Sequence, residues 1–173
     1  MKNFGARFSL YPMSDKFIPI ILGALEKTDT TGLYSNTDRI STVYGGSAEN
    51  VVIAVENLFV SSYTEGVHEA VEGIFSNSES FDISDATVKK EIAADFPVKC
   101  MVAVYGGEKS ENIFAEFERT AQTKSEKIPY GLRLDGGVNR VWTEIKELAL
   151  SLENSGEKFT LYFKMNCNSP TAE

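Results

Sequence analysis

Hydrophobic and polar positions along the chain follow one order of spacings, and that order occurs twice. Near the start, Arg7–Tyr11 alternates between polar and apolar residues, which predicts a strand. Ser14–Lys27 follows with apolar residues at helical spacing, and Pro19 lies near its start, where a proline costs least. The apolar stripe of this helix consists of Ile18, Ile21, Leu22 and Leu25.

The rest of the first half predicts two strands, a helix and a final strand. These elements are a short strand around Leu33-Tyr34, a strand over Arg39–Tyr44, a helix after Ser47 with a stripe of Val51, Ala54, Val55 and Leu58, and a strand over His68–Phe75. The resulting order is βαββαβ, which is the arrangement of ferredoxin-like folds.

The second half repeats this order, although its second strand has no visible pattern. The other elements are a strand over Val98–Tyr105, a helix over Ser110–Gln122, a strand near Pro129–Leu134, a helix over Val138–Leu152 and a strand over Lys158–Asn166. Identical residues recur 91 positions apart, namely Gly45-Gly46 with Gly136-Gly137, Glu56 with Glu147, and Asn77-Ser78 with Asn168-Ser169. The sequence therefore predicts an internal repeat.

These patterns predict an α+β protein made of two tandem ferredoxin-like repeats with antiparallel sheets. We expect the first repeat over residues 1–78, a linker over 79–96 and the second repeat over 97–173. A short helix is expected in the linker over Ser84–Asp95, because Val88 and Ile92 are four residues apart and Pro97 ends the pattern. One face of each sheet would be bare unless the other half or another subunit covers it, and ligand crevices would then form between sheets.

Composition narrows the classes of function. The 173 residues include 25 acidic and 17 basic ones, so the formal net charge is −8, and this disfavours nucleic acid as a partner. The longest apolar run, Phe17–Leu22, is far shorter than a membrane span and contains Pro19. The first residues show no signal-peptide core, so we expect a cytoplasmic protein without membrane insertion.

Metal and redox chemistry have few residues to use. His68 is the single histidine, and we expect it on a solvent-facing strand beside Glu69. Cys100 and Cys167 form no disulfide framework or Cys-x-x-Cys motif, and we interpret them as buried thiols. Trp142 falls on a helix stripe and is expected in the core. We therefore predict no metal site and no cofactor.

Polar residues on predicted central strands are the candidates for binding in the first half. They are Ser9, Tyr11, Asp38, Ser41 and Thr42. Hydroxyls and a carboxylate in that place would suit a ring with donors and acceptors, or they would simply lie at a wet sheet surface. Ser9 and Tyr11 share a face, whereas Ser41 and Thr42 point to opposite faces, and periodicity does not decide which one faces the helices. Gly45-Gly46-Ser47 is expected to be a turn with a helix cap.

The comparable region of the second half holds four candidates for a second site. They are Tyr105, Tyr130, Arg133 and Asp135. An ion pair between Arg133 and Asp135 on one strand face is possible, and Tyr130 suits either stacking on a ligand or core packing. No group of residues demands catalysis, so we expect a protein that is not an enzyme.

Several short segments together resemble the YkoF family. They are Arg7-Phe8-Ser9-Leu10-Tyr11-Pro12-Met13, Lys27-Thr28-Asp29-Thr30, Thr37-Asp38, Ile40-Ser41-Thr42-Val43 and Asn168-Ser169-Pro170. The resemblance covers most of the first half and little of the second.

This resemblance implies a homodimer of tandem ACT-like repeats. It also implies a non-enzymatic protein that binds thiamin or its hydroxymethylpyrimidine moiety, linked to uptake or salvage of thiamin precursors. By that resemblance Asp38 or a hydroxyl would accept from the exocyclic amine, and Tyr11 would form an aromatic wall. The second half departs from the pattern, because Leu132-Arg133 stands where the first half has Ser41-Thr42, and Arg133 would repel a thiazolium cation.

Two other classes of function stay open. An ACT-like regulatory module would sense another small metabolite. A small salvage enzyme would use Asp38 or Glu72 as its acid or base.

Overall fold

The computed structural model describes residues 2–84 and 87–171. The first half forms six elements in the predicted order. They are β1 (Phe4–Pro12), α1 (Phe17–Lys27), β2 (Tyr34–Thr37), β3 (Thr42–Gly46), α2 (Ala48–Ser62) and β4 (Glu69–Ser76). The hydroxyl of Ser47 accepts from the backbone N–H of Asn50, so it caps α2 as the sequence predicts.

The second half forms the same six elements. They are β5 (Pro97–Gly106), α3 (Glu108–Thr120), β6 (Lys124–Ile128), β7 (Gly131–Gly137), α4 (Val138–Asn154) and β8 (Phe159–Cys167). The strand without a visible pattern is β6, whose residues are almost all exposed at the edge of the sheet. The α+β fold with two βαββαβ repeats is therefore confirmed.

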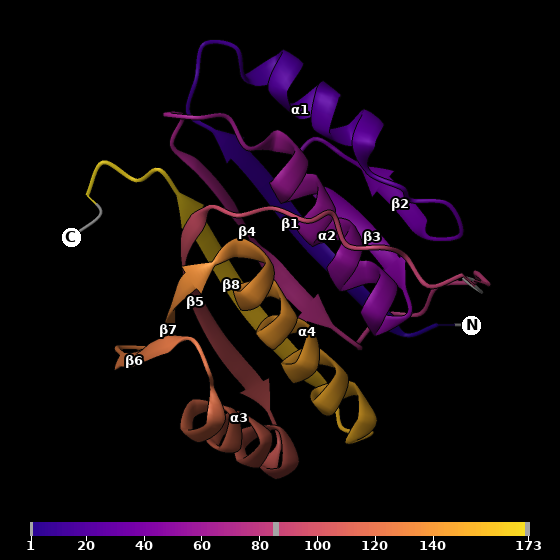
Figure 1. The fold of residues 1–173 in the computed structure, drawn as a ribbon. Helices are drawn as coiled ribbons and strands as arrows, with labels where there is room; N and C mark the ends of the chain where they lie inside the picture. The colour runs from indigo at the N-terminus through magenta and orange to yellow at the C-terminus, as the bar shows by residue number, and fades with distance from the viewer. Residues whose placement is uncertain (1, 85–86, 172–173) are drawn as a thin grey trace.

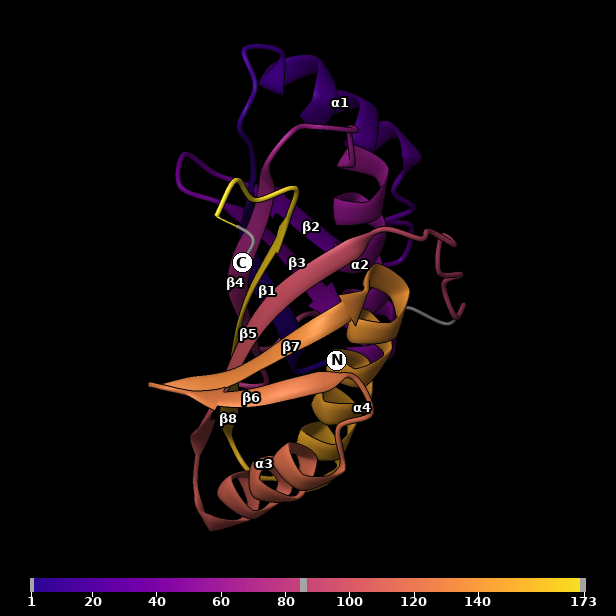
Figure 2. The same ribbon diagram turned by 60° about the vertical axis from the view of Figure 1, so that its left-hand side comes forward.

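The two halves share one eight-stranded antiparallel sheet. The strand order is β2-β3-β1-β4-β8-β5-β7-β6, so the edge strands β4 and β8 of the two repeats pair with each other. All four helices lie on one side of this sheet (Figures 1 and 2). Of the two possible covers for the bare faces, the other half is not used, because the halves extend the sheet sideways and leave both bare faces on the same open side.

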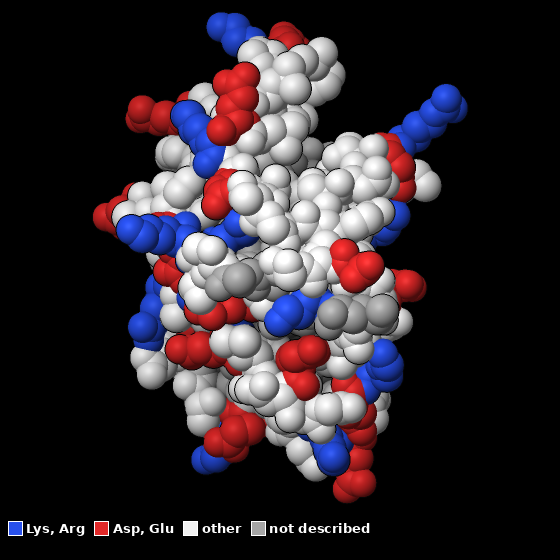
Figure 3. Space-filling view, turned by 90° about the vertical axis from the view of Figure 1, so that its right-hand side faces the viewer, with Lys and Arg blue, Asp and Glu red and all other residues white. Residues whose placement is uncertain are grey.

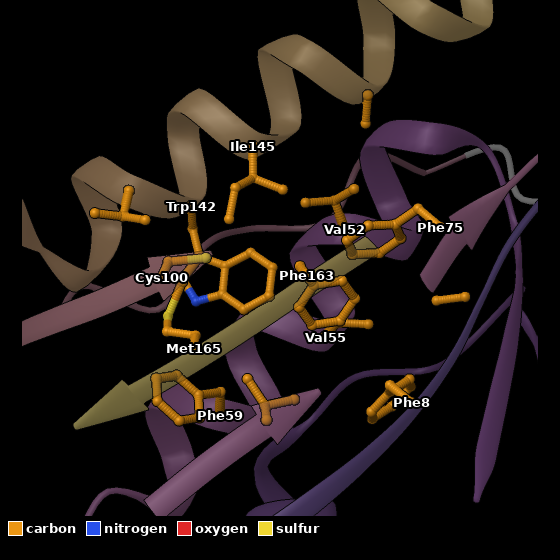
Figure 4. Close-up of a cluster of buried hydrophobic side chains, with 14 of the residues drawn as sticks. Phe8, Val52, Val55, Phe59, Phe75, Cys100, Trp142, Ile145, Phe163 and Met165 are labelled. Carbon is orange, nitrogen blue, oxygen red and sulfur yellow. The ribbon is translucent and has the colours of Figure 1, made fainter. Parts of the chain in front are cut away.

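A single hydrophobic core runs beneath the helices of both halves. Phe75 of β4 stacks on Phe163 of β8, with ring centroids 4.7 Å apart, and Trp142 of α4 meets Phe163 edge-on at 5.6 Å. Figure 4 shows these rings meeting where the two repeats join. Trp142 is fully buried, as its place on the helix stripe predicts. The core is therefore continuous between the two repeats.

Helix α1 differs from its prediction. Only Ala24 is buried, whereas the predicted core residues Ile18 and Leu22 are more than half exposed. The helix packs mainly against α2 and reaches little of the sheet, so it has more apolar positions than neighbours to cover them.

The linker helix expected over Ser84–Asp95 is also wrong for the described residues, since 87–95 are not helical; residues 85–86 lie outside the described part. Side chains of the neighbouring helices bond this segment instead. Asn50 and Asn57 of α2 and Asn139 of α4 each accept from one linker N–H and donate to one linker carbonyl. These bonds satisfy the linker backbone in an extended form, and Figure 1 shows it crossing over the helices.

The offset between the repeats is 90 rather than 91 residues at the third strand and second helix. Helices α2 and α4 follow their cap residues Ser47 and Gly137, which are 90 positions apart. A Cβ on Gly45 would point to the open face, toward Phe81, whereas one on Gly136 would meet Val141 of α4. The two glycine pairs therefore do not superpose, and Gly46 corresponds to Gly136.

Charged side chains of both signs are interspersed over the face in Figure 3. Neither positive nor negative side chains dominate that face.

Candidate functional site

An open depression of about 720 Å³ lies on the bare sheet face of the first half. Its floor comes from one row of paired residues across four strands, and two aromatic side chains stand at its end. The principal lining residues are Arg7, Asn36, Val43, Ile74, Tyr34 and Phe81. We call this hollow the first depression.

Segment 78–82 forms one wall of the first depression. Lys2 and Phe81 pair as an isolated β-bridge, which brings the segment back over the sheet. The Phe81 ring then lies on Gly5 and Gly45, where a Cβ would come within 2.7 and 2.3 Å of ring atoms, and its centroid is 5.2 Å from that of Tyr34. The absence of side chains at these two glycines therefore makes room for the aromatic wall.

Arg7 connects the first depression to the hairpin turn between β2 and β3. Its guanidinium donates to Asp38 Oδ2 at 3.0 Å and to Ser41 Oγ at 2.7 Å. Asp38 Oδ1 also accepts from the N–H groups of Ile40 and Ser41, at 2.8 and 2.9 Å. These two backbone hydrogen bonds, followed by the Arg7 contact, lower the pKa of Asp38 to about 2. Asp38 therefore holds the turn and orients Arg7.

Because of the same turn, β3 begins later in the chain than predicted. The expected strand began at Arg39, but β3 begins at Thr42 because Asp38 closes a tight turn over residues 38–41. Ser9 lies beside this turn, with its hydroxyl 3.5 Å from the carbonyl of Ile40. The structure thus gathers Ser9, Asp38 and Ser41 around Arg7.

Two other candidates of the first half lie apart from this group. Thr42 pairs with Phe8 on the helix side of the sheet and contacts the hydroxyl of Thr37 at 3.0 Å. Tyr11 is half exposed at the far end of β1 and does not line the first depression. The choice between Ser41 and Thr42, which periodicity left open, is therefore settled in favour of Ser41 for the open face.

A second open depression, of about 690 Å³, lies on the bare face of the second half, at the opposite end of the sheet. A row of paired residues crosses its floor: Asn166 of β8, Lys99 of β5, Asp135 of β7 and Lys124 of β6. Arg133 and Lys164 also line it. We call this hollow the second depression.

Two of the four candidates of the second half line the second depression, and the other two do not. Arg133 and Asp135 both line the second depression, with Nε and Oδ2 3.5 Å apart, so their expected pairing is present. Tyr130 is 88% exposed in the turn between β6 and β7, with a φ of 68°, and its ring stands clear of the hollow. Tyr105 lies at the other end of β5, in the row of Thr160.

Matching positions in the two depressions carry side chains that differ in charge and polarity. The first-half row Ser76, Gly5, Gly45 and Tyr34 corresponds to Asn166, Lys99, Asp135 and Lys124. In the next row, Val43 corresponds to Arg133 and Ile74 to Lys164. The first depression holds one base, Arg7, against the two acids Glu79 and Asp82, whereas the second holds four bases against one acid.

Sequence reasoning missed several of these side chains. Arg7 stands in the alternating strand two positions before Ser9, so alternation alone would have placed it on the same face. Lys99 and Lys124 share a floor only because of the pairing between β5, β7 and β6, and Phe81 reaches the sheet only through its bridge to Lys2. These last placements have no local signal in the sequence.

Two carboxyl groups are buried in the first half and line neither depression. Burial raises the pKa of Glu56 and of Glu69 to about 7. Glu56 accepts from Asn139 Nδ2 at 2.7 Å, and Glu69 accepts from the Ser62 hydroxyl. At the matching places the second half has Lys146 and Phe159.

The remaining titratable candidates lie in buried or plain structural surroundings. Cys100 and Cys167 are free and buried, and burial raises the pKa of Cys167 to about 12. His68 is only partly exposed and precedes β4, so its expected place on a solvent-facing strand is wrong. Over residues 2–84 and 87–171, no three His, Cys, Asp or Glu side chains gather as metal ligands, and no helix is long and apolar enough to cross a membrane.

Comparison with known proteins adds two findings. Residues 3–80 match the family described as the YKOF-related Family, and this range includes the Arg7–Asp38–Ser41 group and most of the first depression, but not Phe81 and Asp82. The chain is also 28% identical over 184 aligned positions to the Bacillus subtilis (strain 168) protein named "Putative HMP/thiamine-binding protein YkoF". That alignment covers 96% of this chain and 91% of the relative, so it includes both repeats. The chain is therefore similar to the YkoF family in its first half, and to this relative over nearly its whole length.

Proposed function

We propose that the protein binds thiamin or its hydroxymethylpyrimidine moiety in the first depression, without catalysing a reaction on it. The observation that carries the proposal is the lining of that hollow: two apolar floor residues, two aromatic side chains and two acids beside one arginine. Thiamin joins an aminopyrimidine to a thiazolium cation, so it needs flat apolar contact, hydrogen-bond partners and negative charge. The name of the B. subtilis relative supports the same ligand class.

Each feature of the ligand has a matching group. Val43 and Ile74 offer apolar floor to a ring, and Tyr34 and Phe81 offer aromatic faces beside it. Arg7 donates toward a ring nitrogen, and the Asn36 side chain accepts from an exocyclic amine. Glu79 and Asp82 attract the thiazolium cation.

The roles of the predicted residues change accordingly. Asp38 already accepts three hydrogen bonds, so we propose that it positions Arg7 instead of meeting the amine itself. Ser9 and Ser41 support the same turn. The aromatic wall that Tyr11 was expected to supply is assigned to Tyr34 and Phe81.

We propose with it a role in the uptake or salvage of thiamin precursors, a cytoplasmic place and a homodimer. The open sheet face is the surface that a second copy would cover. Light scattering at micromolar concentration tests the dimer, and a monomeric mass would contradict it.

Calorimetric titration of the protein with thiamin and with neutral hydroxymethylpyrimidine tests the function. We expect saturable binding of both ligands. The double variant Glu79→Gln/Asp82→Asn should weaken thiamin by about fivefold, because two exposed charge contacts contribute about 1 kcal/mol together, and should leave the neutral pyrimidine unchanged.

The matched control is Asp15→Asn/Glu65→Gln, which removes the same two charges outside the depression. Its affinity for thiamin should equal that of the wild type. Absence of binding heat and of a thermal shift with both ligands would refute the proposal. Turnover of the pyrimidine would replace it with the salvage-enzyme hypothesis.

A further inference from the structure

The second depression differs from the first in carrying an excess of positive charge. Four basic side chains line it: Lys99, Lys124, Arg133 and Lys164. At the matching positions the first depression has Gly5, Tyr34, Val43 and Ile74. All four changes introduce a cation, so the second hollow is unsuited to the thiazolium of thiamin.

Two of these cations are already paired within the protein. Arg133 contacts Glu126 at 2.6 Å and Asp135 at 3.5 Å, and Lys164 contacts Glu72 at 3.5 Å. Lys99 and Lys124 form no ion pair with any of the residues that the structure describes. They flank Asp135 on the two neighbouring strands, so two uncompensated ammonium groups face one hollow.

Asp135 supplies the complementary feature. Its side chain is 19% exposed, and its Oδ1 is buried without a hydrogen-bond partner in the described part of the chain. A buried carboxylate oxygen without a donor is costly, so a bound N–H group would relieve that cost. Asp135 therefore offers a hydrogen-bond acceptor to an amine of a ligand. Lys99 and Lys124, on either side of it, offer hydrogen-bond donors to an anion.

We propose that the second depression binds a phosphate ester of a small amino-substituted heterocycle, with the phosphate at Lys99 and Lys124 and the amine at Asp135. The choice of an aminopyrimidine as the heterocycle rests on the proposed function; the anion and the amine rest on the second depression alone. The two repeats of one chain would then hold different chemical forms of one type of ring, the cationic or neutral form in the first half and the phosphorylated form in the second.

The test is calorimetric titration with hydroxymethylpyrimidine, its phosphate ester and inorganic phosphate. The ester should bind at least tenfold more tightly than either inorganic phosphate or the pyrimidine alcohol at this site. Lys99→Gln/Lys124→Gln should weaken the ester by at least tenfold, because hydrogen bonds to charged groups are the strong ones, and should leave thiamin binding unchanged. Asp135→Asn should weaken the ester but not inorganic phosphate.

The control Lys27→Gln/Lys127→Gln removes two lysines outside the second depression and should bind the ester like the wild type. An ester affinity that is unchanged in the Lys99/Lys124 variant, or equal to that of inorganic phosphate, would overturn the inference. Thiamin binding would stand in that case. Lysine-dependent binding of the ester without any binding of thiamin or of hydroxymethylpyrimidine in the first depression would instead refute the proposed function and support this inference.

Discussion

The two halves of this protein share a backbone and differ in what they present on it. In the first half, the row consists of Ser76, Gly5, Gly45 and Tyr34, and its two glycines leave room for the Phe81 ring. In the second half, the matching row consists of Asn166, Lys99, Asp135 and Lys124, and it is polar and uncovered. A repeated fold therefore conserves the place of a hollow without conserving its chemistry. We propose that the charge of a few floor residues decides which ligand each repeat favours.

The halves also differ in what they bury. The first half buries Glu56 and Glu69, where the second half has Lys146 and an apolar Phe159. Each folded carboxyl holds its proton to about pH 7, against about 4.5 when unfolded. Both of these carboxyl groups with a raised pKa therefore lie in the first half.

The largest expected effect is therefore on stability against pH. Because the folded state binds these protons more tightly, stability is full below about pH 4.5 and is lost as the pH rises through 7, by roughly 3 kcal/mol for each carboxyl. Glu69→Gln should remove about half of this loss. Denaturant unfolding at pH 5 and pH 8 measures it, with the exposed Glu65→Gln as control. An equal pH dependence in wild type and Glu69→Gln would show that Glu69 is not the group.

The second effect concerns the aromatic wall. Gly45→Leu places a Cβ 2.3 Å from Phe81 Cγ, so the ring has to leave the sheet. We expect a loss of about 2 kcal/mol in unfolding free energy, as for other overpacked sites, and loss of thiamin binding. Gly23→Leu is the control, because nothing lies within 4 Å of a Cβ there. A Gly45→Leu variant that binds thiamin like the wild type would remove Phe81 from the site.

The third prediction exchanges a residue between the halves. Arg7→Met installs the side chain found at the matching position Met101. We expect the affinity for hydroxymethylpyrimidine to fall about tenfold, or about 1.4 kcal/mol, with less than about 1 kcal/mol lost in stability because Arg7 is half exposed. Calorimetry and thermal unfolding measure the two quantities. Arg119→Met, an exposed paired arginine on α3, is the control.

The smallest effect is expected for Asp38→Asn. The amide still accepts from the turn N–H groups but no longer pairs as an anion with Arg7, so affinity should fall only about two- to fivefold. The melting temperature of the free protein should hardly change at pH 7. A melting temperature lowered by several degrees would mean that Asp38 holds the fold instead of the site.

The fold was predictable because it depends on local spacing. Alternation at Arg7–Tyr11 and the stripe around Trp142 each give an element its type and its buried side. The linker was not predictable, because Asn50, Asn57 and Asn139 satisfy its backbone from other elements and override the spacing of Val88 and Ile92. The glycine pairs misled the alignment by one residue because identical residues there lie on opposite faces.

The candidate site was predictable in part for the same reason. Ser9, Ser41 and Asp38 come together because they flank neighbouring strands, and Arg133 and Asp135 because they are two apart on one strand. Alternation along β1 also places Arg7 on the open face, whereas the lysine pair depends on which residue faces which across the sheet. That register is set by long-range pairing, and no window of the sequence contains it.

The pairing of β4 with β8 has a consequence for how the chain matures during synthesis. Strand β8 follows every other strand in the chain but lies at the centre of the sheet, between β4 and β5. Until β8 emerges from the ribosome, β4 and β5 each present an unpaired edge, which is a template for association with other chains. The last strand to be synthesised therefore pairs with both of these edges. Before β8 has been synthesised, the nascent chain most needs protection against association with other chains.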